Sequence, residues 1–207
     1  MKFIKQIFVV LVLLCATQAY AEPELGKDYT VLKPAQPTSS GSKIEVLEFF
    51  FYGCSHCFKL HPLLSAWEKT MPKDVELTFV PAIFNPSWEA MARTFYALEA
   101  LDQRKQLHDD LFKAWDSGVE LIDETRATNF VVQHGVDRKK FSDAYNSFSM
   151  QSKIMRTRQM GQIYNIRGTP TLIVDGKYLI TGLHPPETMQ VLNALIDKAR
   201  KEHIGKK

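Results

Sequence analysis

Val46-Leu-Glu-Phe-Phe-Phe-Tyr-Gly-Cys-Ser-His-Cys57 is the stretch of sequence that decides how this chain folds. It belongs to a nearly continuous apolar run, Ile44–Tyr52, that is interrupted only by two glutamates. A run of this kind, bounded by turn residues, predicts a central strand that is buried on both faces. Gly53 then allows a turn, and apolar residues recur at helical spacing from Cys54 to Thr70. We therefore expect both cysteines at the start of a helix that directly follows a central strand.

The segments that flank this stretch extend an α/β pattern. Val75–Ile83 predicts a second strand, so that strand, helix and strand form a βαβ unit with a right-handed crossover. Pro62 is expected to kink the helix near its second turn, because proline removes one backbone hydrogen bond. We also expect a hairpin, in which Asp175-Gly176 joins the strands Thr171–Val174 and Tyr178–Thr181. A closing helix should begin at Pro185-Pro186, and Lys27–Leu32 should form a short edge strand.

A long helical segment separates the two regions of predicted strand. Asn85-Pro86 is a typical helix start, with Asn as the cap and Pro in the first position. Stripes of apolar residues at helical spacing continue from there to about Asn165. The predicted class is therefore α/β, with the order βαβ, a helical insertion, and ββα. We expect residues 22–84 and 162–207 to form one α/β unit and residues 85–161 to form the inserted helical domain.

Residues 1–21 have the three parts of a secretory signal peptide. Lys2 and Lys5 precede the apolar run Ile7–Ala16, and Ala19-Tyr20-Ala21 has the small-x-small pattern at which cleavage occurs. The apolar run is shorter than the ~20 residues that are needed to span a bilayer. We therefore expect cleavage at the end of this segment and export of the mature chain, with an uncleaved anchor as the alternative.

Removal of the signal peptide changes both the charge and the number of cysteines. The formal net charge falls from +3 to +1, because two lysines and no acidic residue are lost. A nearly neutral chain argues against a nucleic-acid partner. Cys15 is lost as well, so that Cys54 and Cys57 are the only cysteines of the mature chain. In an oxidising compartment, an isolated pair of cysteines at this spacing indicates a redox-active Cys54–Cys57 disulfide rather than a structural disulfide.

The start of the helix gives the two cysteines different predicted roles. Unpaired backbone N–H groups and the helix dipole stabilise a thiolate there, so Cys54 is the expected nucleophile. Cys57 lies one turn further in and is the expected buried, resolving thiol. His56 lies between the sulfurs and supplies a hydrogen-bond donor, and a charge when protonated, which favours an oxidant over a reductase. The alternative for His56 is an ordinary exposed helix residue.

Glu48 and the Thr169-Pro170 pair are two further candidates. An acid inside a buried strand is costly unless it is partnered or protonated. Because its strand leads to the cysteines, Glu48 either transfers protons to Cys57 or points outward at a sheet edge. Gly168 and the Thr169-Pro170 pair precede a strand, and most X–Pro bonds in folded proteins are trans. The residues alone therefore predict an ordinary trans proline at the start of that strand.

Taken together, these features resemble the DsbA group of thioredoxin-fold thiol oxidases of the bacterial periplasm. The resemblance rests on residues 46–57, the helical insertion and Gly168-Thr-Pro-Thr-Leu172. It implies a thioredoxin fold with an inserted helical domain, in which Cys54 attacks and Cys57 resolves. A lowered pKa of the first cysteine is already a known property of that family.

The resemblance also implies roles for residues outside the cysteine pair. Pro170 would be cis and lie against the disulfide, Thr169 would contact a bound substrate strand, and Glu48 would be the buried acid near the cysteines. The family further implies a periplasmic location and reoxidation by a membrane, quinone-linked partner of the DsbB type. Ser55 departs from the best-known motif, which has Pro at this position, and we place Ser55 with Thr169 and Pro170 among the residues that contact substrate.

Three other functions remain as alternatives. A periplasmic metal-binding chaperone would use the cluster of Cys54, His56, Cys57 and His61, although His56 is poorly placed to point inward with the sulfurs. A disulfide reductase or isomerase commonly has a dimerisation domain, for which this chain has no spare segment. A holdase without redox activity has no need of an intact pair of cysteines.

We therefore predict an enzyme that donates its Cys54–Cys57 disulfide to reduced, folding exported proteins through a mixed disulfide on Cys54. It is expected to act as a monomer, without a cofactor, a metal or a nucleic-acid partner. Several apolar residues near the cysteines either line a groove for unfolded chains or belong to the core: Phe51, Tyr52, Phe58 and Leu172.

Overall fold

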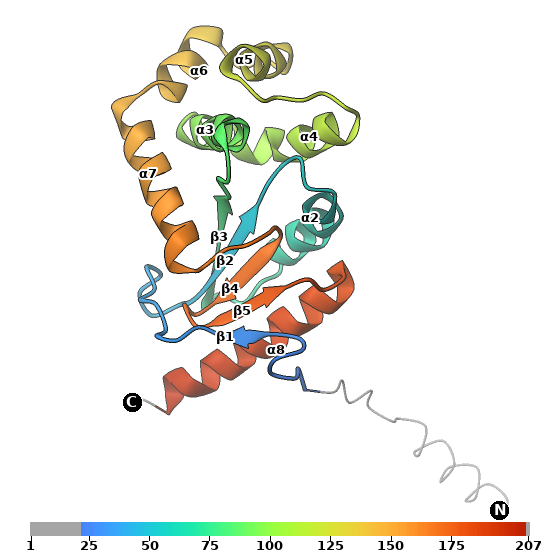
Figure 1. Cartoon of the computed structure of the whole chain (residues 1–207), viewed down its shortest axis with the longest axis vertical. Coiled ribbons are helices and arrows are strands. Elements are labelled where there is room, and N and C mark those ends of the chain that lie inside the picture. Colours follow the sequence, from blue (N-terminus) through green and yellow to red (C-terminus); the bar gives the residue numbers. More distant parts are fainter. Residues whose placement is uncertain (1–21, 206–207) are drawn as a thin grey trace, which may run out of the picture.

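A computed structural model describes residues 22–205 of the chain, and the predicted signal peptide at residues 1–21 lies outside them. One five-stranded mixed sheet forms the base of the molecule, and a group of helices lies above it (Figure 1). The strand order is β1-β5-β4-β2-β3. The strands are β1 Thr30–Val31, β2 Ile44–Phe50, β3 Val75–Pro81, β4 Thr171–Val174 and β5 Tyr178–Thr181.

The apolar run of the sequence forms β2, which lies between β4 and β3 in the sheet and is buried along its whole length. It pairs in parallel with β3 and antiparallel with β4, which confirms the predicted βαβ unit and the hairpin that follows. The edge strand β1 is shorter than the predicted segment 27–32. The chain makes a turn just before it, in which the Gly26 N–H donates to the Tyr29 carbonyl at 2.8 Å.

Helices α2 (Ser55–Glu68) and α8 (Pro185–Ile204) cover one face of the sheet. Val46 on β2, Leu60 on α2 and Leu192 on α8 belong to the same apolar cluster, and each is fully buried. Pro62 lies inside α2, as the sequence predicts. The opposite face packs on the end of helix α7 (Phe148–Ile163) and on the segment that follows it, through Phe49 and Ile166.

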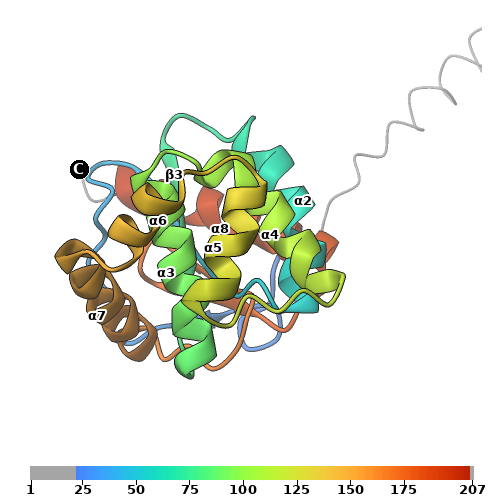
Figure 2. The same ribbon diagram turned by 90° about the horizontal axis from the view of Figure 1, so that it is seen from above.

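The segment between β3 and β4 folds as five helices, which lie over one end of the sheet (Figure 2). Asn85 caps α3 by accepting from the Trp88 N–H at 3.1 Å, and Gly135 separates α5 from α6 with a φ of +87°. The apolar core of these helices continues into the sheet through Phe50 on β2, and to the start of α2 through Cys57. The helices are α3 Pro86–Ala100, α4 Arg104–Asp116, α5 Glu124–Gln133, α6 Arg138–Tyr145 and α7, whose bounds are given above.

Candidate active site

A tight connection between β2 and α2 places the two cysteines. Cys54 is the N-cap of α2, and its Sγ accepts a hydrogen bond from the Cys57 N–H at 3.4 Å. Both cysteines are free thiols, so the structure shows the dithiol form. Gly53 precedes them where a side chain has no room, because a Cβ there would lie within 3 Å of atoms of Phe51 and Trp115. The predicted position of the cysteines at a helix start is confirmed.

The thiol of Cys54 is strongly acidic in this setting. The hydrogen bond from the Cys57 thiol lowers the pKa of Cys54 most, and the Thr169 side chain and the backbone N–H groups of Cys57 and His56 add to it. Together they overcome partial burial and bring the pKa of Cys54 from 9.0 to about 5. At neutral pH Cys54 is therefore a thiolate, and it is only partly buried.

Cys57 has the opposite character. It is fully buried, and this burial, followed by its hydrogen bond to Cys54 and the charge of Glu48, raises the pKa of the Cys57 thiol far above its ordinary value. Cys57 is therefore protonated at neutral pH. The two sulfurs thus differ in both exposure and charge, in the direction that the helix start predicts.

Glu48 lies in the central strand, opposite Phe79 on one side and Leu172 on the other, and it is 1% exposed. Loss of solvation, followed by the negative charge of Cys54, raises the pKa of Glu48 to about 8. Its Oε1 has no hydrogen-bond partner. The alternative that Glu48 points outward at a sheet edge is therefore wrong, whereas its part in proton transfer stays a prediction.

Ser55 and His56 are both exposed in the first turn of α2. The contact that His56 makes with the site comes from its backbone, whose N–H helps to lower the pKa of Cys54. Any backbone at this position supplies such an N–H. Tuning by the imidazole of His56 and substrate contact by Ser55 therefore stay predictions.

The Thr169-Pro170 peptide bond is cis, as the family resemblance implies and contrary to the trans bond that the residues alone predict. The residue before this proline lies against the active site, since the Thr169 carbonyl oxygen is 3.2 Å from the Cys54 Sγ. Contact of Thr169 and Pro170 with a substrate strand stays a prediction.

A buried polar network behind the cysteines is the main feature that the sequence analysis missed. The Tyr52 hydroxyl and the His108 Nδ1 lie 2.7 Å apart, and the His61 Nε2 lies 2.6 Å from the Asp109 Oδ1. The two imidazole rings meet edge to face, with centroids 4.6 Å apart. Nothing in the sequence joins His108 to Tyr52, because only the packing of α4 on the connection between β2 and α2 brings them together.

The network also bears on the metal-chaperone alternative. His61 was a candidate ligand there, but its Nε2 is engaged by Asp109. In the part of the chain that the structure describes, no three side chains of His, Cys, Asp or Glu are grouped so as to hold a metal ion.

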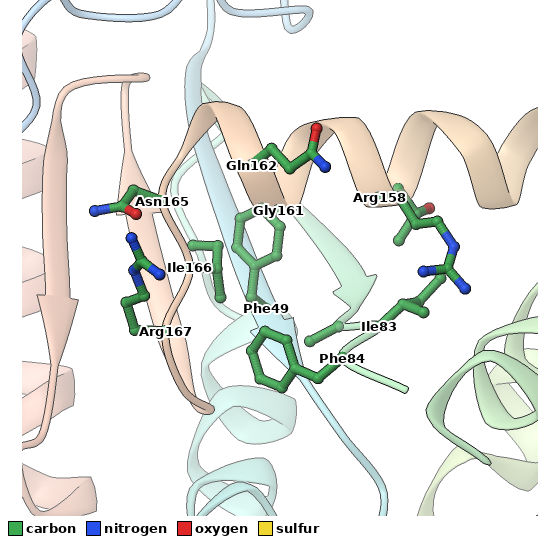
Figure 3. Close-up of a pocket in the computed structure, with 11 residues that line it drawn as sticks. Phe49, Ile83, Phe84, Arg158, Gly161, Gln162, Asn165, Ile166 and Arg167 are labelled. Atoms are coloured by element: carbon green, nitrogen blue, oxygen red, sulfur yellow. The ribbon is translucent and has the colours of Figure 1, made fainter. Parts of the chain in front are cut away.

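Two cavities lie near this end of the sheet. The first has a volume of about 380 Å³ and is lined by Cys54 together with Phe51, Tyr52 and Phe58, whereas Leu172 belongs to the core. The second, about 350 Å³, lies between α7 and the segment that follows β3 (Figure 3). Phe51 and Tyr52 are themselves buried in the core, so the core alternative holds for them as for Leu172, and Phe58 is partly buried against the same core. Use of this cavity as a groove for unfolded chains stays a prediction.

A βαβ and ββα sheet, a Cys-x-x-Cys pair at the start of the first helix, and a cis proline whose preceding residue contacts the Cys54 sulfur define a thioredoxin-fold dithiol–disulfide oxidoreductase. The model of the DSBA-like thioredoxin domain family matches residues 59–192. The chain therefore belongs to the DsbA family, and it is a disulfide-donating oxidoreductase.

Relatives of known name agree with this assignment over nearly the whole chain. The thiol:disulfide interchange protein DsbA of Pseudomonas syringae is 36% identical, with 87% of this chain and 86% of that protein covered. The DsbA of Burkholderia cepacia is 35% identical over 89% of both chains. The crystal structure of Pseudomonas aeruginosa DsbA superposes with a TM-score of 0.84 at 32% identity, covering 89% of this chain and 97% of that one.

Proposed function

We propose that the protein donates its Cys54–Cys57 disulfide to reduced, folding exported proteins. A substrate thiolate attacks the Cys54 sulfur, the Cys54–Cys57 bond breaks, and Cys57 leaves and takes up a proton. A second substrate thiolate then attacks the substrate sulfur of this mixed disulfide, and Cys54 leaves as a thiolate. The substrate loses two electrons, which reduce the disulfide of the enzyme. The observation that supports these roles is the contrast between a half-exposed, acidic Cys54 and a buried Cys57 with a raised pKa.

The surrounding residues take supporting roles in this proposal. Glu48 supplies the proton to Cys57, since its raised pKa keeps it protonated at neutral pH and its Oε1 is free. Thr169 and Pro170 hold the substrate strand beside Cys54, with Ser55 at the edge of the same surface. His56 tunes the thiolate from the first turn of α2.

The cellular setting is also proposed. Residues 1–21 direct export to the periplasm, where the enzyme works as a monomer and a DsbB-type membrane partner reoxidises Cys54 and Cys57. Residues 22–84 and 162–207 form the α/β unit that carries the redox site, and residues 85–161 form the inserted helical domain. Among residues 22–205, no helix is long and apolar enough to cross a membrane.

Trapping of the mixed disulfide tests the mechanism. A Cys57→Ala variant has no disulfide of its own to donate, so the step is run in reverse with oxidised substrate proteins. The Cys54 thiolate attacks a substrate disulfide and one substrate thiolate leaves. Because no Cys57 thiol is present to release the product, substrate proteins should remain attached to Cys54 and run as larger species on non-reducing gels. A Cys54→Ala variant is the matched control and should trap nothing. Failure of Cys57→Ala to accumulate mixed disulfides would show that Cys54 is not the attacked sulfur.

The redox equilibrium of the purified protein with glutathione separates an oxidase from a reductase or isomerase. We expect the dithiol form to persist at glutathione ratios that oxidise an ordinary protein dithiol, because the Cys54 thiolate stabilises it. A disulfide form that is hard to reduce would favour a reductase. Metal titration in parallel tests the chaperone alternative, which requires binding that depends on both cysteines.

A further inference from the structure

A second groove lies on the sheet face opposite α2 and α8, and the proposed reaction does not use it. Its walls are the last turns of α7, residues 165–167 and residues 82–84 (Figure 3). Phe49 and Ile166 form a buried apolar floor, and Phe84 stands at the rim with 47% of its surface exposed. A volume of about 350 Å³ is within the range of sites that bind small ligands or a few residues of a peptide.

All charged groups of this groove are positive. Arg158 and Arg167 lie at opposite ends of it, and none of its lining residues is acidic (Figure 3). Arg158 contacts the Glu89 carboxylate at 2.5 Å, but Arg93 shares that carboxylate, so one positive charge remains uncompensated in the trio. Arg167 is exposed. An apolar floor between two guanidinium groups selects an apolar ligand that carries a carboxylate.

The groove continues into the loop that contacts Cys54. Arg167 is two residues before Thr169, so their Cα atoms are at most ~7.6 Å apart. The Thr169 carbonyl oxygen lies 3.2 Å from the Cys54 sulfur. Gly168 lies between them with open space where a side chain would be. An extended chain advances ~3.3 Å per residue, so a substrate segment about three to five residues from the bound cysteine reaches Arg167.

We propose that this groove is a second contact site for the polypeptide that Cys54 oxidises. It takes a segment in which a large apolar residue is next to Asp or Glu, located three to five residues from the reacting cysteine. The apolar side chain rests on Phe49 and Ile166, and the carboxylate pairs with Arg167. The inference rests on the proposed function, because it assumes that the substrate strand lies along Thr169.

Matched dithiol peptides test this inference. One peptide carries Glu-Phe four residues from its first cysteine, and the other carries Lys-Phe at the same position. Each peptide is made in two versions, with this dipeptide either before or after the cysteine. The rate at which each reduces the disulfide form of the protein is measured by thiol trapping at low salt. In one placement we expect the Glu peptide to react about five times faster than the Lys peptide, as for an exposed ion pair, and the preference to fall as salt is added.

Three variants test whether the groove causes the preference for the Glu peptide over the Lys peptide. Arg167→Gln removes the proposed charge, and Gly161→Leu fills the groove from α7, where a new side chain meets open space in the free protein. Both should bring the Glu-to-Lys rate ratio close to one. Arg156→Gln is the matched control, because it removes an exposed arginine of α7 that does not line the groove, and it should keep the ratio.

Dithiothreitol separates failure of this inference from failure of the proposed function. It should reduce the native protein and all three variants at equal rates, since it is too small to reach the groove. If dithiothreitol and both peptides fail to reduce the disulfide, the proposed function is wrong. If the peptides react but show equal rates in the native protein, or a ratio that Gly161→Leu leaves unchanged, the groove is not a substrate site. Binding of a cysteine-free Glu-Phe peptide without any rate preference would assign the groove to another partner and overturn the proposal.

Discussion

At the scale of single residues, one turn of helix separates two sulfurs with opposite properties. Cys54 caps α2 and collects hydrogen bonds to its thiolate, whereas Cys57 points into the core next to a buried acid. This difference in acidity between Cys54 and Cys57 does not require an unusual residue type beside them. It arises because the cap of a helix exposes unpaired N–H groups and the next turn is covered by the protein.

The first prediction concerns the ionisation of Cys54. The alkylation rate of the dithiol form should follow a single titration with a midpoint near the pKa of about 5, and only Cys54 should be modified. In Cys57→Ala the midpoint should rise, because the hydrogen bond from the Cys57 thiol lowers the pKa of Cys54 most. His56→Ala measures the contribution of the imidazole. A midpoint that Cys57→Ala does not move would contradict this account of the acidity.

The second prediction concerns Glu48. Its folded pKa of about 8 lies above its ordinary value of 4.5, so between these values the folded state holds a proton that the unfolded state has lost. The contribution of Glu48 to stability therefore falls as pH rises through this window, by up to ~1.4 kcal/mol per pH unit. Glu48→Gln should remove this loss and make the protein more stable at pH 8, with less effect at pH 5.

Urea unfolding of the dithiol form at the two pH values measures this effect. Glu45→Gln is the matched control, because Glu45 lies on the same strand but accepts hydrogen bonds from Ser39. A stability difference between Glu48→Gln and the native protein that is the same at pH 5 and pH 8 would show that Glu48 is ionised in the folded state.

At the scale of elements, the sequence predicts what local chemistry controls. The apolar run gives β2, Asn85-Pro86 gives the start of α3, and Asp175-Gly176 gives the hairpin between β4 and β5. In each case the signal lies within a few residues. The short β1 was harder to predict, since a turn at Gly26 and its pairing with β5 decide its length. Contacts between α2 and α4 have no local signal at all.

The third prediction concerns the contact of α4 with the active-site connection. The Tyr52 hydroxyl and His108 form a buried hydrogen bond, so Tyr52→Phe leaves the His108 Nδ1 without a partner. This should lower the free energy of unfolding by ~1–3 kcal/mol, the cost of an unpaired buried polar group. Adding His108→Leu to Tyr52→Phe should recover part of the loss, because both partners are then apolar.

Urea unfolding of the two single variants and the double variant gives the coupling energy directly. Tyr164→Phe is a suitable control, because this buried tyrosine packs on Phe49 at the other face of the sheet and lies outside the network. Simple additivity of Tyr52→Phe and His108→Leu would mean that the hydrogen bond contributes no coupling between α4 and the active-site connection.

At the scale of the whole molecule, the site is assembled from distant parts of the chain. Cys54 and Thr169 are 115 residues apart and meet across the sheet. The sequence predicts the cysteines and their roles, because the helix start is local, but the residues alone predict a trans proline at 170. Only the whole fold, or its resemblance to a family, indicates that this bond is cis and that Thr169 contacts the sulfur. For the same reason the groove at Arg167 is invisible in the sequence.

The last prediction links the site to the stability of the whole protein. Cys54 has its pKa lowered from 9.0 to about 5, so its thiolate stabilises the folded dithiol form fully above pH 9 and progressively less as pH falls toward 5. The disulfide form has no thiolate and lacks this contribution, whereas the burial of Glu48 in the central strand does not depend on the thiolate and largely cancels from the difference. The dithiol form should therefore be the more stable one at pH 7, a direction already known for the DsbA family.

We expect the Cys54 thiolate to contribute about 1–2 kcal/mol to this difference at pH 7, after allowance for solvent screening of a partly exposed sulfur. Urea unfolding of the two forms at pH 5, 7 and 9 measures it, and the gap should widen with rising pH. Closure of the four-residue loop acts through the unfolded chain and stabilises the disulfide form by up to ~1.9 kcal/mol in the chain-entropy model, but this contribution does not vary with pH, so the widening of the gap measures the thiolate. Cys54→Ser carries no thiolate and forms no Cys54–Cys57 disulfide, so its stability should not rise from pH 5 to pH 9 relative to that of the native disulfide form. A gap that does not widen from pH 5 to pH 9 would contradict the stabilising role of the Cys54 thiolate and, with it, the direction of electron flow from substrate to enzyme.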